Sequence, residues 1–184
     1  MEVQRLLHEI GWPIAVSGEP DPKTKQAIRD FKRGYAFRPV FVSFGARTGP
    51  VFRRRLRKSA QLGGACSKHF KFREFASSQS GWIRTHRELV RGLERVRKQV
   101  NHPIDVLSGF RDFNLGASKS QHKFGNAMDP TSPLPLDACL RAKAFSGIGL
   151  QPGTREVRHL DVRHVGPNFT GGTVANPTIF DDNF

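Results

Sequence analysis

The pattern of apolar residues changes at a glycine pair, Gly63-Gly64, and this change limits the folds open to the chain. Before the pair, apolar residues recur with the spacing of an amphipathic helix, as in Val3–Ile10. After it, a long amphipathic helix at Ile83–Val100 stands among short runs of β-branched residues that are typical of strands. The sequence therefore predicts an α+β protein, with a small helical module at residues 1–62 and a second domain at residues 63–184.

Local signals add boundaries to these elements. Asp21 stands before Pro22, which predicts a helix N-cap followed by proline at the first helical position. Short strands are expected at Ile104–Leu107 and Val157–Val165. Beyond Gly166 the chain is rich in glycine, proline, asparagine and threonine, so we expect an irregular tail on the domain surface.

The charge of the chain indicates an anionic partner. The 184 residues carry a formal net charge of +14, and the pI is about 10.9. Such a surface attracts either nucleic acid or the anionic polymers of a bacterial envelope, and charge alone favours neither. No nucleic-acid-binding motif is recognisable, so specific binding of nucleic acid is not expected.

The N-terminal segment and the cysteines bear on where the protein is made. The first residues have mixed charges and no unbroken apolar core, so they do not resemble a signal peptide, and no stretch is long enough to cross a bilayer. We therefore expect synthesis in the cytoplasm with no secretion route of its own. Cys66 and Cys139 lie far apart in sequence, and we expect two partly buried free thiols, with a single disulfide as the alternative.

The stretch Ser120–Asp129, S-Q-H-K-F-G-N-A-M-D, contains two residues of types that bind metal ions, His122 and Asp129. A hydrolytic zinc site needs three protein ligands, an open position for water and a nearby base. A spacing of seven is too long for one helical turn, and it suits a loop followed by a strand, with the intervening glycine allowing a tight bend. The only histidines downstream are His159 and His164, so either could be the third ligand.

An acidic residue stands three positions before each of these two histidines. Glu156 precedes His159, and Asp161 precedes His164. Residues three apart on a regular strand point to opposite faces. Glu156 could therefore serve a metal held by His159 only if a bulge or turn at Val157 brought both side chains to one face.

Four sequence motifs together resemble a known family of zinc peptidases. The pattern S-x-H-x-x-G-x-A-x-D, followed by a short H-x-D strand, is similar to that of the D-Ala-D-Ala carboxypeptidases and L-alanyl-D-glutamate endopeptidases, which cleave the peptide stems of bacterial peptidoglycan. Ile104–Arg111 resembles the family strand that ends in S-G-[YF]-R, Asn114–Ala117 resembles its N-x-G-A loop, and His69–Phe75 resembles its entry strand. The resemblance covers roughly residues 67–166 and implies an α+β zinc peptidase domain with a short antiparallel sheet.

The resemblance implies a role for each motif residue. The Zn²⁺ ligands that it implies are His122, Asp129 and His159. Glu156 would be the base that activates the attacking water. Arg111 would stabilise the oxyanion or hold the substrate carbonyl, and Ser120 would orient the site or the substrate.

The same resemblance bears on the third ligand. The run R-H-L-D-V-R matches the family's H-x-D strand, which favours His159 over His164. Asp161 is then a hydrogen-bonding partner of the ligand, rather than the acid of an alternative Asp161/His164 pair.

The N-terminal module also resembles a known domain. Val3–Phe31 is similar to the small helical peptidoglycan-binding domain of many wall hydrolases, through L-L-H-E-I-G-W-P at Leu6–Pro13 and V-S-G-E-P-D-P-K-T-K-Q-A-I-R-D-F at Val16–Phe31. The usual turn of that domain, D-G-x-x-G-P-K-T, is replaced here by S-G-E-P-D-P-K-T, so the resemblance implies its fold and not its ligand contacts. The basic segment Arg53–Lys58 would add a general attraction to an anionic wall.

Together these features predict an endolysin-like peptidoglycan hydrolase that uses Zn²⁺, as in bacteriophages. We expect a monomer that is made in the cytoplasm of the bacterial host and reaches the peptidoglycan after the membrane is permeabilised. One alternative is a tail-associated or cellular wall-remodelling D,D-carboxypeptidase with the same chemistry. The other is a non-catalytic cationic protein that binds the wall or nucleic acid and keeps a dead peptidase fold.

Overall fold

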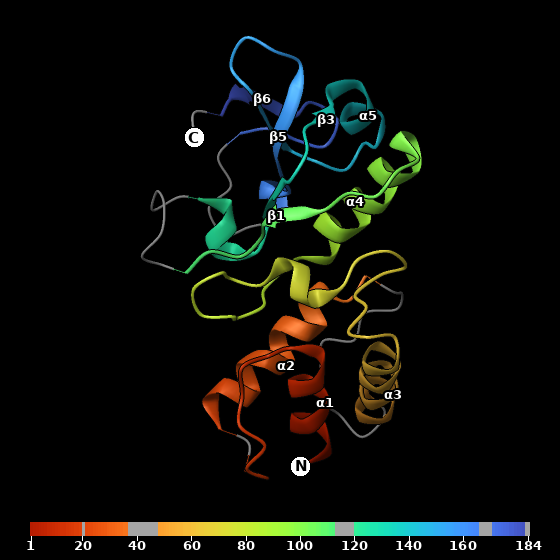
Figure 1. The fold of residues 1–184 in the computed structure, drawn as a ribbon, viewed down its shortest axis with the longest axis vertical. Helices are drawn as coiled ribbons and strands as arrows, with labels where there is room; N and C mark the ends of the chain where they lie inside the picture. Colours follow the sequence, from red (N-terminus) through yellow and green to blue (C-terminus); the bar gives the residue numbers. More distant parts are fainter. Residues whose placement is uncertain (20, 37–47, 113–119, 166–170, 183–184) are drawn as a thin grey trace.

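The chain has an α+β fold, as the sequence predicts, with five α-helices and a mixed sheet of six strands in the part that the structure describes (Figure 1). This computed structural model describes residues 1–19, 21–36, 48–112, 120–165 and 171–182. The helices are α1 (Glu2–Ile10), α2 (Pro22–Gly34), α3 (Thr48–Gln61), α4 (Arg87–Val100) and α5 (Leu136–Arg141). The strands are β1 (Val106–Ser108), β2 (Ala127–Pro130), β3 (Leu134–Pro135), β4 (Gly147–Leu150), β5 (Glu156–Asp161) and β6 (Thr178–Asp181).

The N-terminal helices form where the sequence predicts them. The side chain of Asp21 accepts a hydrogen bond from the backbone N–H of Thr24 at 2.5 Å, and Pro22 is the first residue of α2, which confirms the predicted cap. Helix α1 buries Leu6, Leu7 and Ile10 on one face. The three helices α1–α3 make up the lower part of the molecule in Figure 1.

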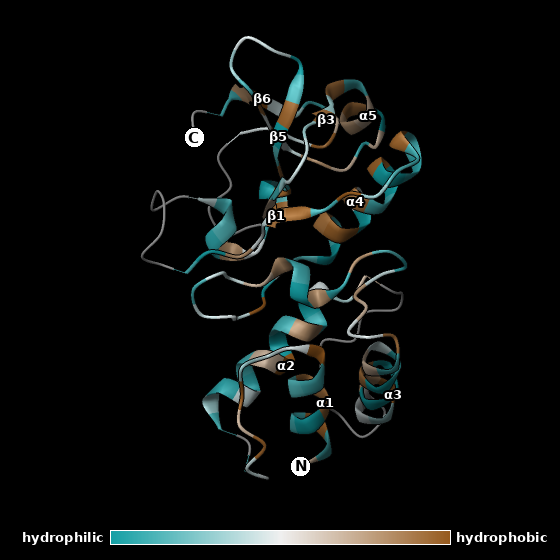
Figure 2. Cartoon of the chain, in the orientation of Figure 1, coloured by the Kyte–Doolittle hydropathy of each residue, from teal (hydrophilic) through white to brown (hydrophobic). Residues whose placement is uncertain are grey.

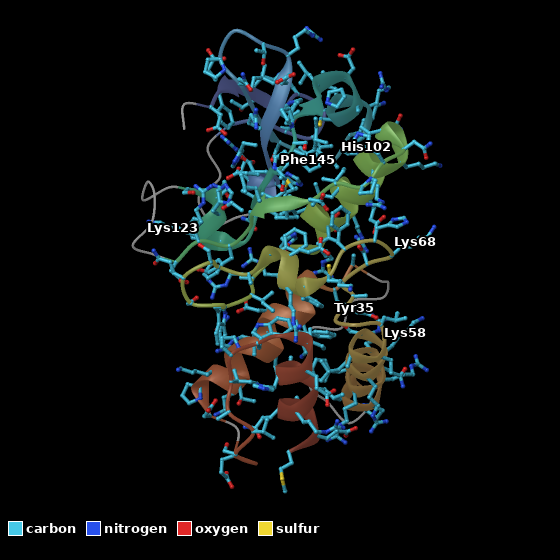
Figure 3. All side chains as sticks on the ribbon, in the orientation of Figure 1. Tyr35, Lys58, Lys68, His102, Lys123 and Phe145 are labelled. Carbon is cyan, nitrogen blue, oxygen red and sulfur yellow. The ribbon has the colours of Figure 1, made fainter. Side chains whose placement is uncertain are left out.

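Helix α4 begins four residues later than the apolar pattern suggests. His86 caps it, because its Nδ1 accepts the N–H of Glu88 at 3.2 Å, and Ile83 lies buried in the preceding segment. A Cβ added at Gly92 would lie 2.7 Å from the ring of Phe145, so this glycine lets the sheet half approach the helix. Figure 3 labels Phe145 in the interior of the upper half.

The sheet is mixed rather than antiparallel, which corrects part of the expectation. Its strand order is β1-β2-β5-β4-β6, and β3 also pairs with β5. Strand β6 pairs with β4 in parallel, with Gly149 opposite Phe180. The prediction of an irregular tail is therefore wrong at Thr178–Asp181, which covers the backbone groups that β4 would otherwise leave unpaired at the sheet edge.

The predicted entry strand His69–Phe75 is also wrong in the structure. Phe72–Phe75 form a turn of 3₁₀-helix, in which the Glu74 carboxylate accepts the N–H of Lys71 at 3.0 Å. This turn buries Phe72 and Phe75 completely, although they are three residues apart, which a regular strand would not do. The motif loop Asn114–Ala117 lies outside the described residues.

One apolar core extends across the predicted boundary at Gly63-Gly64. Phe72 lies with its ring centroid 5.0 Å from that of Trp12 and 5.2 Å from that of Phe31. Tyr35, labelled in Figure 3, belongs to the same core where α2 ends. Figure 2 shows the hydrophobic faces of the helices turned toward the interior, with hydrophilic residues outside.

A buried polar network also joins the two halves. Asp30 of α2 is 3% exposed and accepts hydrogen bonds from Trp82 Nε1 at 3.0 Å and Arg84 Nε at 3.2 Å. Arg33 donates to Asn126 Oδ1 at 2.7 Å, close to the start of β2. The helical part and the sheet part are thus packed together by both apolar and charged contacts.

Two further expectations can be compared with the structure. Cys66 and Cys139 are both free and buried, which confirms the prediction of free thiols, and burial raises the pKa of Cys139 to about 12. Among the helices of the described ranges, none has both the length and the apolar character needed to cross a membrane.

Candidate metal centre

The segment Ser120–Asp129 folds as a short helical turn that leads into a strand. His122 lies in a 3₁₀-helix, Gln121–Phe124, and Asp129 lies in β2. Gly125 ends the turn with a φ of +67°, and a Cβ there would lie 2.7 Å from the carbonyl oxygen of Arg84. Only glycine fits both the positive φ and the close approach, as the sequence predicts for this bend.

Three side chains meet where β2 and β5 lie side by side. His122 Nε2 lies 3.1 Å from Asp129 Oδ1 and 3.2 Å from His159 Nδ1, and His159 Nδ1 lies 2.9 Å from Asp129 Oδ1. All three side chains are buried. In the described residues this is the only group of three or more histidine, cysteine or acidic side chains close enough to hold a metal ion.

The hydrogen bonds behind the cluster determine which nitrogens face it. His122 Nδ1 lies 2.6 Å from the carbonyl oxygen of Gly109, which can only accept, so a neutral His122 turns an unprotonated Nε2 toward the cluster. His159 Nε2 lies 3.2 Å from the carboxylate of Asp161, so a neutral His159 likewise turns an unprotonated Nδ1 inward. Two nitrogen lone pairs and one carboxylate oxygen then converge with no donor among them, an arrangement that requires a cation.

The size of the triangle fits a tetrahedral metal. Bonds of about 2.0–2.1 Å to nitrogen and oxygen give ligand-to-ligand edges of about 3.3 Å in a tetrahedron. The three edges here measure 2.9–3.2 Å, so the atoms occupy approximately one face of such a site. A fourth position opposite this face would be left for water or substrate. The donor set and its spacing therefore fit a bound divalent metal ion.

The pKa values of the three cluster residues also indicate that the cluster favours a positive charge. Burial lowers the pKa of His122. Burial acts in the same direction on His159, but hydrogen bonds with Asp129 and Asp161 outweigh it and raise the pKa of His159 to about 9. Burial alone would raise the pKa of Asp129, yet its contacts with the two histidines hold it well below its usual range. Without a metal ion, a proton on His159 is the cation of the cluster.

The structure places His159, and not His164, beside the other two candidate ligands. His164 lies in the turn that follows β5, where its Nδ1 is 2.8 Å from Ser146 Oγ. Asp161 contacts His159 and also accepts hydrogen bonds from Arg163, as close as 2.5 Å. The proposed partner role of Asp161 toward His159 thus agrees with the geometry.

Strand β5 contains the irregularity that Glu156 requires. In the pairing with β4, His159 is opposite Gly149 and Val157 is opposite Leu150, so Arg158 is an extra residue on β5. The extra residue interrupts the strict alternation of faces between Glu156 and His159. The side chain of Glu156 is exposed to solvent, and it forms no hydrogen bond or ion pair with the cluster among the described residues.

Arg111 and Ser120 differ in their relation to the cluster. The guanidinium of Arg111 forms an ion pair with Asp129 Oδ2, and its Nε donates to Ser108 Oγ at 2.8 Å. Arg111 therefore holds the second oxygen of the candidate ligand. Ser120 is only two residues from His122, at the start of the turn, but its hydroxyl forms no hydrogen bond with any described residue.

Sequence reasoning missed the two residues that β6 brings to the site. The ring of Phe180 lies 5.7 Å from that of His159, and Arg163 lies 5.2 Å from the centroid of Phe180. Asp182 follows β6, and a Cβ added at Gly149 would lie 3.0 Å from Asp182 Cβ and 2.8 Å from His159 Cβ. The only sequence signal for a strand here is the short run T-I-F-D-D. The glycine- and proline-rich segment before it indicates an irregular structure more strongly.

Comparison with known proteins adds no relative: no family model matches the chain, and no curated protein is significantly similar to it. The motifs of the sequence and the geometry of the cluster are therefore what bear on the function of this protein.

Proposed function

We propose that the protein is a zinc-dependent peptidase that hydrolyses the peptide stems of bacterial peptidoglycan, in the manner of a phage endolysin. The observation that carries the proposal is the buried triangle of His122, Asp129 and His159, formed from motif residues in the order of the peptidase family. Two neutral imidazoles and one carboxylate leave a zinc site with a net charge of +1. When bound there, zinc would lower the pKa of a water molecule to about 7 and polarise the scissile carbonyl.

The residues around the triangle supply orientation and charge. Asp129 is held from behind by Arg111, so that its Oδ1 stays directed at the two histidines. The side chain of Arg111 is 31% exposed, and a substrate carbonyl could therefore approach its guanidinium. His159 is fixed by Asp161 on the opposite side of its ring.

The N-terminal helices support a wall substrate. Helices α1 and α2 lie close to the ranges that the sequence pattern predicts, within the segment that resembles the small peptidoglycan-binding domain. Helix α3 exposes Arg53, Arg54 and Lys58, and Lys58 is labelled on this helix in Figure 3. Such a surface would attract anionic wall polymers in a salt-dependent manner.

The test is digestion of purified peptidoglycan by the full chain with added Zn²⁺, followed by mass analysis of the released fragments. We expect stem-peptide cleavage that is abolished by a chelator and by His122→Ala. Equal digestion with a chelator present would contradict the zinc mechanism. Cleavage between L-Ala and D-Glu would identify an endopeptidase, and release of terminal D-Ala would identify the carboxypeptidase alternative.

The non-catalytic alternative has a separate signature. A protein that binds peptidoglycan or nucleic acid through charge alone should lose affinity steeply as salt is added, and should contain no stoichiometric zinc. Metal analysis of the purified protein, combined with sedimentation of peptidoglycan at two salt concentrations, therefore separates it from the proposed enzyme.

A further inference from the structure

A basic hollow lies where the end of α4 meets the loop that follows Cys66. Its volume is about 570 Å³, which is within the range of small-ligand sites, and three of its lining residues are the cations Lys68, Arg97 and Lys98. Figure 3 labels Lys68 and also His102, a further lining residue, on the side of the molecule where α4 ends. None of the lining residues belongs to the metal cluster, so the basic hollow is a separate feature of the surface.

The last turns of α4 bring a carboxylate and two of these cations onto one face. Glu94, Arg97 and Lys98 follow the spacing i, i+3 and i+4, which places side chains next to one another on a helix. A glutamate in this spacing ordinarily pairs with the lysine four residues later. Glu94 forms no such pair in this structure, because its two oxygens are bound elsewhere.

The carboxylate of Glu94 instead holds the loop that contains Lys68. Its Oε1 accepts the Ser67 hydroxyl at 2.6 Å and the backbone N–H of His69 at 2.8 Å, and its Oε2 lies 2.6 Å from His69 Nδ1. Burial would raise the pKa of Glu94, but the hydrogen bonds from Ser67 and His69 outweigh it and lower that pKa. An ionised Glu94 therefore fixes the loop beside the helix and leaves Arg97 and Lys98 without a partner carboxylate.

The three cations of the basic hollow have no ion-pair partner in the part of the chain that the structure describes. The side chains of Lys68, Arg97 and Lys98 form neither a hydrogen bond nor an ion pair there. Glu74 acts on Arg97 only at longer range, and its carboxylate accepts the N–H of Lys71. Three cations and one carboxylate give the lining a formal charge of +2 when its histidines are neutral. The hollow is thus suited to an anion.

The donors of the basic hollow suit a phosphate group better than a carboxylate. Lys68 comes from the loop and Lys98 from the helix, so their ammonium groups act as point charges from separate directions, which fits the tetrahedral oxygens of a phosphate. A planar carboxylate is matched instead by two parallel N–H groups of a single arginine. The described residues of the lining include no phenylalanine, tyrosine or tryptophan on which a nucleobase would stack, so a single-stranded nucleic acid fits less well.

We propose that the basic hollow binds a phosphodiester of an anionic wall polymer in which phosphate groups link uncharged polyols. The choice of polymer rests on the proposed function, since a peptidoglycan hydrolase meets such polymers beside its substrate. Lys68, Arg97 and Lys98 would bind the phosphate, whereas the metal cluster would cut the peptide. Binding to the polymer and hydrolysis would then depend on different residues.

The first experiment titrates the full chain with glycerophosphoglycerol, in which one phosphodiester joins two glycerols, at constant ionic strength. We expect NMR to show saturable changes in the amide signals of Lys68, His69 and Lys98. Glucuronate is the carboxylate probe, and it should bind more weakly. Equal or tighter binding of glucuronate overturns the choice of phosphate, and amide changes confined to other surfaces overturn the site.

Two triple variants separate the hollow from general attraction. The test variant should bind glycerophosphoglycerol at least about 10-fold more weakly, because it loses the charge-assisted contacts. The control removes the same charge from exposed residues of α2 and should bind as the unaltered chain does, with thermal melts showing that both variants are folded. Equal weakening in both variants would mean general attraction alone and overturn the proposal. The test variant is Lys68→Gln/Arg97→Gln/Lys98→Gln, and the control is Lys23→Gln/Lys25→Gln/Arg29→Gln.

The second experiment identifies the source of the phosphodiester. Sedimentation compares walls that contain poly(glycerol phosphate), the same walls stripped of it by hydrofluoric acid, and vesicles that contain phosphatidylglycerol. The test variant should sediment less than the control with intact walls, and the two should not differ with stripped walls. A preference of the unaltered chain for the vesicles overturns the wall polymer as the ligand.

Neither experiment requires hydrolysis, so the two proposals can fail separately. Binding of glycerophosphoglycerol in the hollow by a protein that cleaves no peptidoglycan supports this site and contradicts only the proposed function. Stem-peptide cleavage by a protein that binds no phosphodiester contradicts only this site.

Discussion

Two buried aspartates, Asp30 in the helical half and Asp129 in the sheet half, differ in what surrounds them. Asp30 accepts hydrogen bonds from three donors, Gln26 Nε2, Trp82 Nε1 and Arg84 Nε, at 3.0–3.2 Å. Asp129 has Arg111 on one oxygen, but its other oxygen faces two ring nitrogens that are themselves acceptors when neutral. The hydrogen bonds of the Asp30 carboxylate are satisfied within the protein, whereas the Asp129 carboxylate lies among acceptors and requires a cation.

The comparison shows how a buried carboxylate that stabilises the fold differs from one that can bind an ion. Burial is similar at both sites, since Asp30 is 3% exposed and Asp129 is 2% exposed. Burial alone therefore does not identify a site. The balance of hydrogen-bond donors and acceptors identifies a site, because a buried group without a partner is costly unless a bound ligand or ion compensates it.

The largest effect is expected from removing a ligand of the incomplete site. His159→Ala should reduce bound zinc from one ion per chain to background and abolish hydrolysis, because two remaining ligands hold zinc poorly. Metal analysis after dialysis measures the amount of zinc bound per chain. His164→Ala is the control, since His164 binds Ser146 and lies outside the triangle, and it should retain zinc. Loss of zinc in His164→Ala alone would reverse the ligand assignment.

Zinc should also change the stability of the protein through the incomplete site. At a free zinc concentration of about 1,000 times its dissociation constant, the free energy of unfolding should rise by about 4 kcal/mol. Urea titrations with zinc and with a chelator measure the difference. The rise should vanish in His159→Ala and persist in Asp30→Ala. A rise of equal size in His159→Ala would mean that zinc binds elsewhere.

Replacing Asp30, whose hydrogen bonds are satisfied within the protein, should destabilise the fold without affecting metal binding. Asp30→Ala leaves the N–H groups of Trp82 and Arg84 without their acceptor, and should lower the free energy of unfolding by about 2–4 kcal/mol. Asp137→Ala, which breaks an exposed ion pair with Arg155, should have little effect. A zinc content reduced only in Asp30→Ala would contradict the separation of the two aspartates.

The effect that is smallest at neutral pH concerns His86, a half-buried histidine at the start of α4. Burial, assisted by Arg33 and other nearby cations, lowers the pKa of His86 to about 3. The unfolded chain binds a proton near pH 6.5, so the stability that neutral His86 provides is present above that pH and is lost as the pH falls toward 3. His86→Asn keeps a capping side chain and removes this titration. Its stability should therefore depend less on pH between 6.5 and 3, and an unchanged slope would contradict the assignment.

Local signals in the sequence predict the parts of the fold that depend on local chemistry. The cap at Asp21 and the bend at Gly125 follow from side-chain hydrogen bonding and from the freedom of glycine, which a short stretch already contains. The metal triangle was predicted because its members lie in motifs, and the structure brings them within hydrogen-bonding distance. The zinc itself, the reaction and the role of Ser120 stay predictions.

Long-range pairing explains what the sequence did not predict. Strand β6 exists because it covers the edge of β4, and nothing within Thr178–Asp181 indicates that partner. The same is true of Asp182, whose position depends on a parallel pairing with a strand about 30 residues earlier. The turn at Phe72–Phe75 arises because both rings enter a core that is shared with the N-terminal helices.

The core shared by Trp12, Phe31 and Phe72 has a consequence for how a polymer would be cut. When a binding module hangs on a flexible linker, the catalytic part samples many positions along the polymer, and its local concentration depends on linker length. Here a wall strand held by the N-terminal helices would meet the metal cluster at one distance and in one orientation. The cuts would then be spaced by the dimensions of the protein, and the fragments released early in digestion would have a narrow range of lengths.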